Sequence, residues 1–148
     1  MLTRYPAHFA NAGEMRALQL KGLQWTVSHG WENSPFYRDR LAAAGVTPGD
    51  IRSLDDLARL PFTTADDLRD GYPFRLRAAE MKDIVRVHSS SGTTGKRKIL
   101  CYTQKDRDDW AYMFGCCYEM AGVTREDQVQ ICVGYGLWAA GRRTAPPR

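Results

Sequence analysis

The chain has 148 residues, 43% of them hydrophobic and 26% charged, which is typical of one ordinary soluble globular domain. The formal net charge of +4 depends largely on residues 142–148, which contain three arginines and no acid. The rest of the chain is nearly neutral and has no basic stripe with interleaved aromatics, which argues against a nucleic-acid partner. No apolar run is long enough to span a membrane and no signal-peptide core is present, so we expect a cytoplasmic protein.

The cysteines of the chain give no sign of a metal site. They are Cys101, Cys116, Cys117 and Cys132. None belongs to a C-x-x-C pair, and two adjacent cysteines are poorly placed to share a zinc ion. We expect four buried thiols in a reducing compartment.

The first part of the chain predicts a succession of helices. Apolar residues recur in two superposed stripes over residues 14–29, which indicates a helix contacted on more than one side and capped near His29. Ser34 and Pro35 are the residue types of an N-cap and a first helical position. A second helix is therefore expected to begin there and to end at Gly45.

Two short helices are expected next, each opened by an acidic capping box. Ser53 with Asp56, and Thr64 with Asp67, have the spacing of a capping box in which aspartate replaces glutamate. Several aspartates gather in these first turns and suggest a metal cluster. Negative charge that complements the helix dipole explains them without a metal, and we favour that interpretation.

The most distinctive stretch of the chain is a loop rich in hydroxyl groups and glycines. Glycines let the backbone approach a ligand closely, and consecutive N–H groups in such a turn form an anion-binding concavity. A lysine at the end adds a mobile point charge suited to phosphate. The loop therefore predicts a cradle for a polyphosphate, and it consists of Ser89, Ser90, Ser91, Gly92, Thr93, Thr94, Gly95 and Lys96.

This loop is not the P-loop of nucleotide-hydrolysing enzymes. The pattern G-x-x-x-x-G-K-[ST] requires glycine where the chain has Ser90, and serine or threonine where it has Arg97. The flanking residues 84–88 and 98–102 read as strands. The loop is therefore expected to connect the two strands of a hairpin.

A helix and a third strand are expected after the hairpin. Thr103 with Asp106 predicts the start of a helix of about 18 residues that ends at Gly122. Residues 128–133 are rich in apolar side chains and read as a strand, so a right-handed parallel βαβ unit is the default topology. One face of the helix is expected to pack in the core: Trp110, Met113, Phe114, Cys117 and Ala121.

Several separated motifs resemble one known group of enzymes. The S-S-G-T-T-G-K loop between two strands is similar to the phosphate loop of the adenylate-forming superfamily. The flanking motifs resemble its phenylacetate-CoA ligase branch in sequence and in order. They occupy residues 32–38, 44–46, 67–70, 72–74, 85–88, 102–103 and 134–137, and the resemblance extends from about residue 18 to about residue 141.

The resemblance implies an incomplete α/β fold. Residues 1–80 would form an N-terminal helical cap region, and residues 81–141 would begin the AMP-binding domain with strand, phosphate loop, strand, helix and strand. Residues 142–148 have no apolar period and are expected to be a disordered tail. The abrupt change in composition leads to the hypothesis that the reading frame is truncated or shifted near Gly141. A chain that ends within a sheet exposes apolar surface, so we expect poor solubility when it is expressed alone.

The resemblance also implies a two-step reaction. A carboxylate attacks the α-phosphorus of ATP to give an acyl-adenylate and pyrophosphate, and the coenzyme A thiol then displaces AMP. The acid would be an aryl acid such as phenylacetate, and Mg²⁺ would accompany ATP. The eight loop residues would hold the β- and γ-phosphates, although Arg97 replaces the family's usual proline. The full-length form is expected to be able to form a homodimer.

The aryl-acid pocket is expected after the third predicted strand. Ligands of α/β sheets bind outside the carboxyl ends of strands, which is where Tyr135, Gly136 and Trp138 stand. These residues would line the pocket, and a tight turn with two core aromatics is an equally open interpretation.

No catalytic residue can be assigned within the chain. In the family, the adenine-contacting segment, the metal-binding glutamate and the C-terminal lysine lie beyond residue 148. We therefore expect a front portion of a ligase that is inactive alone. Two other classes of function stay open, namely a non-catalytic nucleotide- or phosphate-binding module and a helical interaction module in which the loop is a linker.

Overall fold

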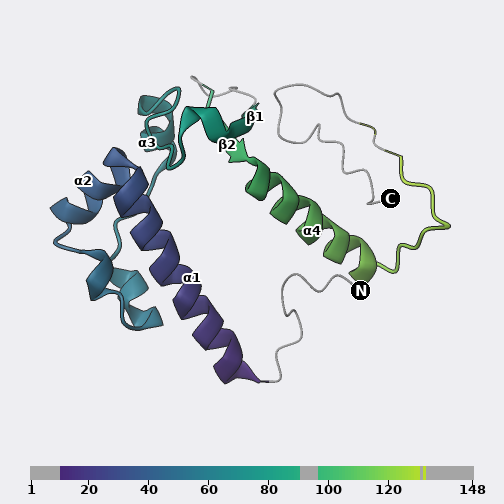
Figure 1. Cartoon of the computed structure of the whole chain (residues 1–148), viewed down its shortest axis with the longest axis horizontal. Helices are drawn as coiled ribbons and strands as arrows, with labels where there is room; N and C mark the ends of the chain where they lie inside the picture. The colour runs from purple at the N-terminus through teal and green to yellow at the C-terminus, as the bar shows by residue number, and fades with distance from the viewer. Residues whose placement is uncertain (1–10, 91–96, 131, 133–148) are drawn as a thin grey trace. The chain divides into compact units, whose positions relative to one another are not determined.

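The computed structural model describes residues 11–90, 97–130 and 132. These residues separate between Glu80 and Met81 into two compact units, a helical unit and a hairpin unit (Figure 1). The helical unit contains α1 (Ala12–Asn33), α2 (Pro35–Ala43), the 3-10 turns Pro48–Asp50 and Leu54–Arg59, and α3 (Ala65–Asp70). The hairpin unit contains the 3-10 turn Met81–Asp83, β1 (Ile84–Ser89), β2 (Ile99–Thr103) and α4 (Gln104–Met120).

Helix α1 is longer than its predicted range. It begins after Asn11, whose side chain accepts a hydrogen bond from the N–H of Glu14. It does not end near His29 as predicted, because the helix continues to Asn33 and ends where Ser34 becomes extended. The N–H of Ser34 still donates to the carbonyl oxygen of Gly30 at 3.0 Å. The proline at the start of α2 is confirmed as a first helical position.

The helical unit has a small apolar core beneath α1. Its buried members are Val27, Leu41, Val46 and Ile51. The side-chain amide of Gln24 donates to the carbonyl oxygen of Ile51, a member of this core, at 2.9 Å. Only one of the two predicted stripes of α1 is covered within the unit, since Leu18 is 43% exposed and Trp25 is 62% exposed.

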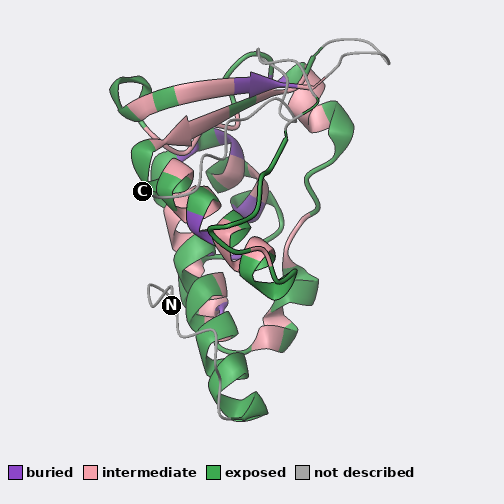
Figure 2. Ribbon diagram, turned by 90° about the vertical axis from the view of Figure 1, so that its right-hand side faces the viewer, coloured by how far each residue is buried: buried purple, intermediate pink, exposed green. Residues whose placement is uncertain are grey.

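Strands β1 and β2 form the predicted hairpin. They pair antiparallel, with His88 opposite Leu100 and Ser89 opposite Ile99. Alternation of side chains along a strand places Arg86 and His88 on the same face of β1. The end of β1 nearest the loop is its buried end, seen as the purple part of the strand in Figure 2. The hairpin prediction is therefore confirmed in pairing and direction.

Helix α4 begins and ends at the predicted residues, but its surroundings differ from the prediction. Thr103 and Asp106 form the capping box, and Gly122 follows the helix with φ +77°. The predicted core face is wrong within the described residues. Met113 is 57% exposed and Phe114 is 39% exposed, while Tyr112 is the buried residue of the helix. The apolar residues do share one face of the helix, as their spacing predicts. Their spacing does not show whether another element covers that face, and burial of the face was the wrong part of the prediction.

The prediction of a strand over residues 128–133 is wrong for the residues that the structure describes. Residues 128–130 and 132 have no strand conformation. A strand needs a hydrogen-bonded neighbour, and the two strands in the described part of the chain pair with each other. A parallel βαβ unit is therefore absent from the described ranges, and the sheet is a two-stranded antiparallel one.

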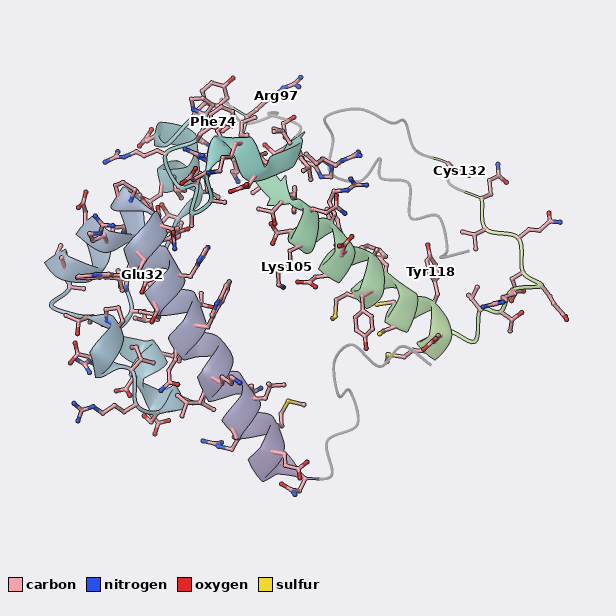
Figure 3. All side chains as sticks on the ribbon, viewed as in Figure 1. Glu32, Phe74, Arg97, Lys105, Tyr118 and Cys132 are labelled. Carbon is pink, nitrogen blue, oxygen red and sulfur yellow. The ribbon has the colours of Figure 1, made fainter. Side chains whose placement is uncertain are left out.

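The cysteines also differ from their prediction in burial. Cys101 and Cys116 are half-buried, whereas Cys117 and Cys132 are exposed, so burial of all four thiols is wrong. Cys132 lies on the stretch that follows α4 (Figure 3).

None of the helices among the described residues combines the length and the apolar character that crossing a bilayer requires.

Candidate functional site

The base of the predicted phosphate loop is closed by a pair of residues that directly follow β1 and precede β2. The N–H of Ser90 donates to the carbonyl oxygen of Lys98 at 3.0 Å. The N–H of Lys98 donates in return to the hydroxyl oxygen of Ser90, also at 3.0 Å. This pair continues the strand register by one position beyond Ser89 and Ile99. The two ends of the loop are thus held at the spacing of an antiparallel ladder.

Two of the eight predicted loop residues lie within the described part of the chain. Ser89 is the last residue of β1 and is 2% exposed, and Ser90 uses its hydroxyl oxygen in the closing pair. The structure thus places both serines in the stem that carries the loop, and their contact with phosphate stays a prediction. The other predicted residues lie outside the described ranges: Ser91, Gly92, Thr93, Thr94, Gly95, Lys96, Tyr135, Gly136 and Trp138.

Beneath the stem, four aromatic rings from three elements pack together. His88 of β1 lies 5.1 Å from Tyr102 of β2 and 5.6 Å from Trp110 of α4, measured between ring centroids. Tyr102 and Trp110 are 5.2 Å apart, and Trp110 is 6.0 Å from Phe114. We call these four residues the stem cluster. It joins both strands to α4, and its member on β1 stands two residues before Ser90.

His88 is the polar member of the stem cluster and is fully buried. The Nε–H of Arg86, two residues earlier on the same face of β1, donates to Nε2 of His88 at 2.6 Å. A guanidinium has donors and no acceptor, so Nε2 must be unprotonated. The imidazole is therefore neutral, with its proton on Nδ1.

Sequence reasoning overlooked His88. The loop residues were singled out because their types suit phosphate, whereas the histidine before them was interpreted as part of a strand and of the family motif at residues 85–88, with no role of its own. A signal was available, because Arg86 and His88 stand two apart in a predicted strand and must share a face. Burial of that face could not be read from the sequence.

The described residues provide charge for an anion but no ready metal site. Arg97 and Lys98 follow the predicted loop directly, and Figure 3 shows Arg97 at the loop end of the hairpin. Over the described ranges, no three His, Cys, Asp or Glu side chains gather closely enough to hold a metal ion. The two cations can contribute favourable charge to an anion bound near this end of the hairpin.

These elements match a segment of the fold of solved CoA ligases. A solved structure of 2-hydroxyisobutyryl-CoA ligase in the postadenylation state with 2-HIB-AMP matches 87% of the chain with a TM-score of 0.79 and 25% identity. A second structure of this ligase, with 2-HIB-AMP and CoA in the thioesterification state, matches 70% of the chain with a TM-score of 0.64 and 31% identity. The chain covers 28% and 23% of those two proteins.

Within that class, the sequence is similar to phenylacetate-coenzyme A ligases. The chain is 46% identical to the ligase of Escherichia coli strain K12 and 47% identical to that of Aromatoleum evansii, over 136 residues in each case. It is 42% identical over 128 residues to the ligase of Thermus thermophilus. The resemblance to the phenylacetate-CoA ligase branch is thus confirmed over most of the chain.

The match covers a limited part of each relative. The aligned region is 92% of this chain but 31% of the ligases of Escherichia coli and Aromatoleum evansii. No protein-family model matches the chain. The chain is therefore similar to a segment of a phenylacetate-coenzyme A ligase, about a third of its length.

Proposed function

We propose that this chain is the part of a phenylacetate-coenzyme A ligase that holds the phosphates of ATP. The complete reaction would ligate coenzyme A to an aryl acid through an acyl-adenylate. The observation that carries the proposal is the closed hairpin stem at Ser90 and Lys98, which presents a hydroxyl- and glycine-rich loop ending in Lys96. The identity to phenylacetate-coenzyme A ligases on both sides of this hairpin supports it.

The chemistry of the first step explains what such a stem would contribute. Adenylation needs the carboxylate, the α-phosphorus and the leaving pyrophosphate in line, with the developing negative charge stabilised. A loop held at both ends loses little conformational freedom when it binds the phosphates, so more of the contact energy appears as affinity. The loop would hold the β- and γ-phosphates, and Mg²⁺ would arrive with the nucleotide.

Other parts of this proposal concern residues or states outside the described ranges. Tyr135, Gly136 and Trp138 are proposed as lining for the aryl acid, and coenzyme A as the second substrate. A homodimer of the full-length form and a cytoplasmic location stay predictions. The chain alone is not expected to complete adenylation, because it covers 31% of the length of its relatives.

Titration calorimetry with ATP and with inorganic pyrophosphate tests the proposal on this chain. We expect binding that is abolished by Lys96→Ala and weakened by Thr94→Ala. Lys21→Ala, a lysine on the exposed surface of α1, is the matched control and should bind as the unaltered chain does. Absence of heat with both ligands would overturn the proposal, as would equal binding by the Lys96→Ala variant.

The titration separates the proposal from a helical interaction module, and a fusion experiment separates it from a non-catalytic binding module. A non-catalytic module would also bind ATP through the loop. In that case, fusion of the chain to the remaining two thirds of a relative would not produce an acyl-adenylate. A helical interaction module would retain its partner after deletion of residues 89–97, and calorimetry would show no dependence on Lys96.

A further inference from the structure

The buried histidine below the loop has contacts that the proposed reaction does not itself require. His88 is fully buried, although a polar ring is costly to bury without hydrogen bonds. It lies against the rings of Tyr102 and Trp110, each from a different element. A phenylalanine could fill the same place among the aromatic rings without a polar nitrogen to satisfy.

The contact with Arg86 sets the chemical state of His88. The guanidinium donates to Nε2 at 2.6 Å, and a protonated Nε2 could not accept this bond. Arg86 thereby fixes both the tautomer and the rotation of the ring, since the bond is satisfied in one orientation only. The ring in turn is held by Tyr102 on the neighbouring strand.

The backbone transmits this placement to the loop. Ser89 and Ser90 follow His88 directly, and two residues of a strand span about 6.6 Å. Ser90 is the residue that closes the loop against Lys98. The imidazole is therefore two residues from the pair that closes the loop, close enough along the strand for its position to influence that pair.

We propose that His88 is a positioning residue for phosphate binding. Its neutral imidazole, oriented by Arg86, holds the end of β1 and with it the closing pair of Ser90 and Lys98, from which the proposed phosphate loop starts. His88 does not touch the ligand in this proposal. The inference rests on the proposed function of the loop, and it adds a polar residue of the stem to the loop residues.

The test compares three variants of the 148-residue chain with the unaltered chain by titration with ATP and inorganic pyrophosphate. His88→Phe keeps an aromatic ring and removes the acceptor. His88→Gln supplies an oxygen acceptor near the position of Nε2. Arg86→Met removes the donor and leaves the histidine ring in its cluster, so it decides the question if His88→Phe does not fold.

We expect the dissociation constant to rise about tenfold or more in His88→Phe and Arg86→Met, with the binding stoichiometry unchanged. His88→Gln should restore most of the affinity. A purely structural role has a different signature, because a partly unfolded sample binds with lower stoichiometry and an unaltered dissociation constant. That signature, or equal affinity in all variants, would overturn the inference.

Nitrogen NMR of the imidazole supplies a second readout. In the unaltered chain, Nε2 of His88 should have the chemical shift of an unprotonated nitrogen and Nδ1 that of a protonated one. A mixture of tautomers should replace this state in Arg86→Met. A protonated Nε2 in the unaltered chain would overturn the inference. Failure of the unaltered chain to bind either ligand would instead refute the proposed function itself, and the positioning role with it.

Discussion

Asp67 links the start of α3 to α2 through its two carboxylate oxygens. One oxygen accepts hydrogen bonds from the N–H of Thr64 at 2.7 Å and from its hydroxyl at 2.9 Å. The other oxygen forms an ion pair with the guanidinium of Arg40. A residue that the sequence identified only as a helix cap thus also holds two helices of the helical unit together.

The contacts of Asp67 predict how the helical unit responds to acid. The N–H of Thr64 first, then its hydroxyl and Arg40, lower the pKa of Asp67 below its ordinary value of 3.8. The folded state therefore keeps the carboxylate charged at a pH where the unfolded chain binds a proton. This contribution is fully present above pH 3.8 and is lost as the pH falls through the lower folded pKa.

We expect Asp67→Asn to unfold at lower urea concentration at neutral pH and to lose less stability than the unaltered chain on acidification. Urea unfolding between about pH 6 and about pH 3, followed by circular dichroism, measures both effects. Asp66→Asn is the matched control, since Asp66 pairs with the neighbouring Arg69 on the surface, where ion pairs contribute little. Equal acid sensitivity in Asp67→Asn and the unaltered chain would contradict the prediction.

The closing pair of the hairpin predicts a local effect of Ser90→Ala. Removing the hydroxyl leaves the N–H of Lys98 without its acceptor, which costs about 0.5–1.5 kcal/mol. We expect amide exchange of Lys98 to accelerate about threefold to tenfold, measured by hydrogen-exchange NMR. Ser90→Thr keeps a hydroxyl and should exchange slowly. Equal protection of Lys98 in all three proteins would show that the hydroxyl does not close the stem.

Two glycines of the helical unit should respond in opposite directions to alanine. A Cβ at Gly71 would lie 2.2 Å from Cδ1 of Leu76 and 2.9 Å from the carbonyl oxygen of Asp67, and the backbone oxygen cannot move away easily. Gly71→Ala should destabilise the chain by about 1–3 kcal/mol. Gly22 lies within α1 with open space around it, so Gly22→Ala should stabilise by about 0.5–1 kcal/mol. Thermal denaturation of both variants measures these effects. A change of the melting temperature in the same direction for both variants would refute the steric argument.

The uncovered apolar face of α4 predicts self-association. Met113 is 57% exposed and Met120 is 88% exposed, seven positions apart and therefore on one side of the helix. We expect the chain to bind a fluorescent hydrophobic dye and to sediment as oligomers. Met113→Glu with Met120→Glu should reduce both signals, whereas Gln104→Glu, an exposed polar position of the same helix, should not. A monomer that binds no dye would contradict the prediction.

Local features of this protein were determined by its sequence alone. The capping boxes at Thr64 and Thr103, the proline at the start of α2 and the turn at Gly122 lie where their residue types predict. Each depends on bonds between residues at most four positions apart, so the chain itself encodes them. The hairpin was predictable for a similar reason, because two alternating segments flank a glycine-rich connection.

The tertiary structure decided what the local pattern could not. Burial of the aromatic face of α4 and a strand over residues 128–133 both require another element to cover or pair with them, and no local pattern supplies that element. For His88 the structure added what the sequence did not predict. The contacts of its ring with Arg86, Tyr102 and Trp110 are visible only in the tertiary structure. Pairing and burial are relations between segments distant in sequence, which is why spacing identified the faces of this protein but not their partners.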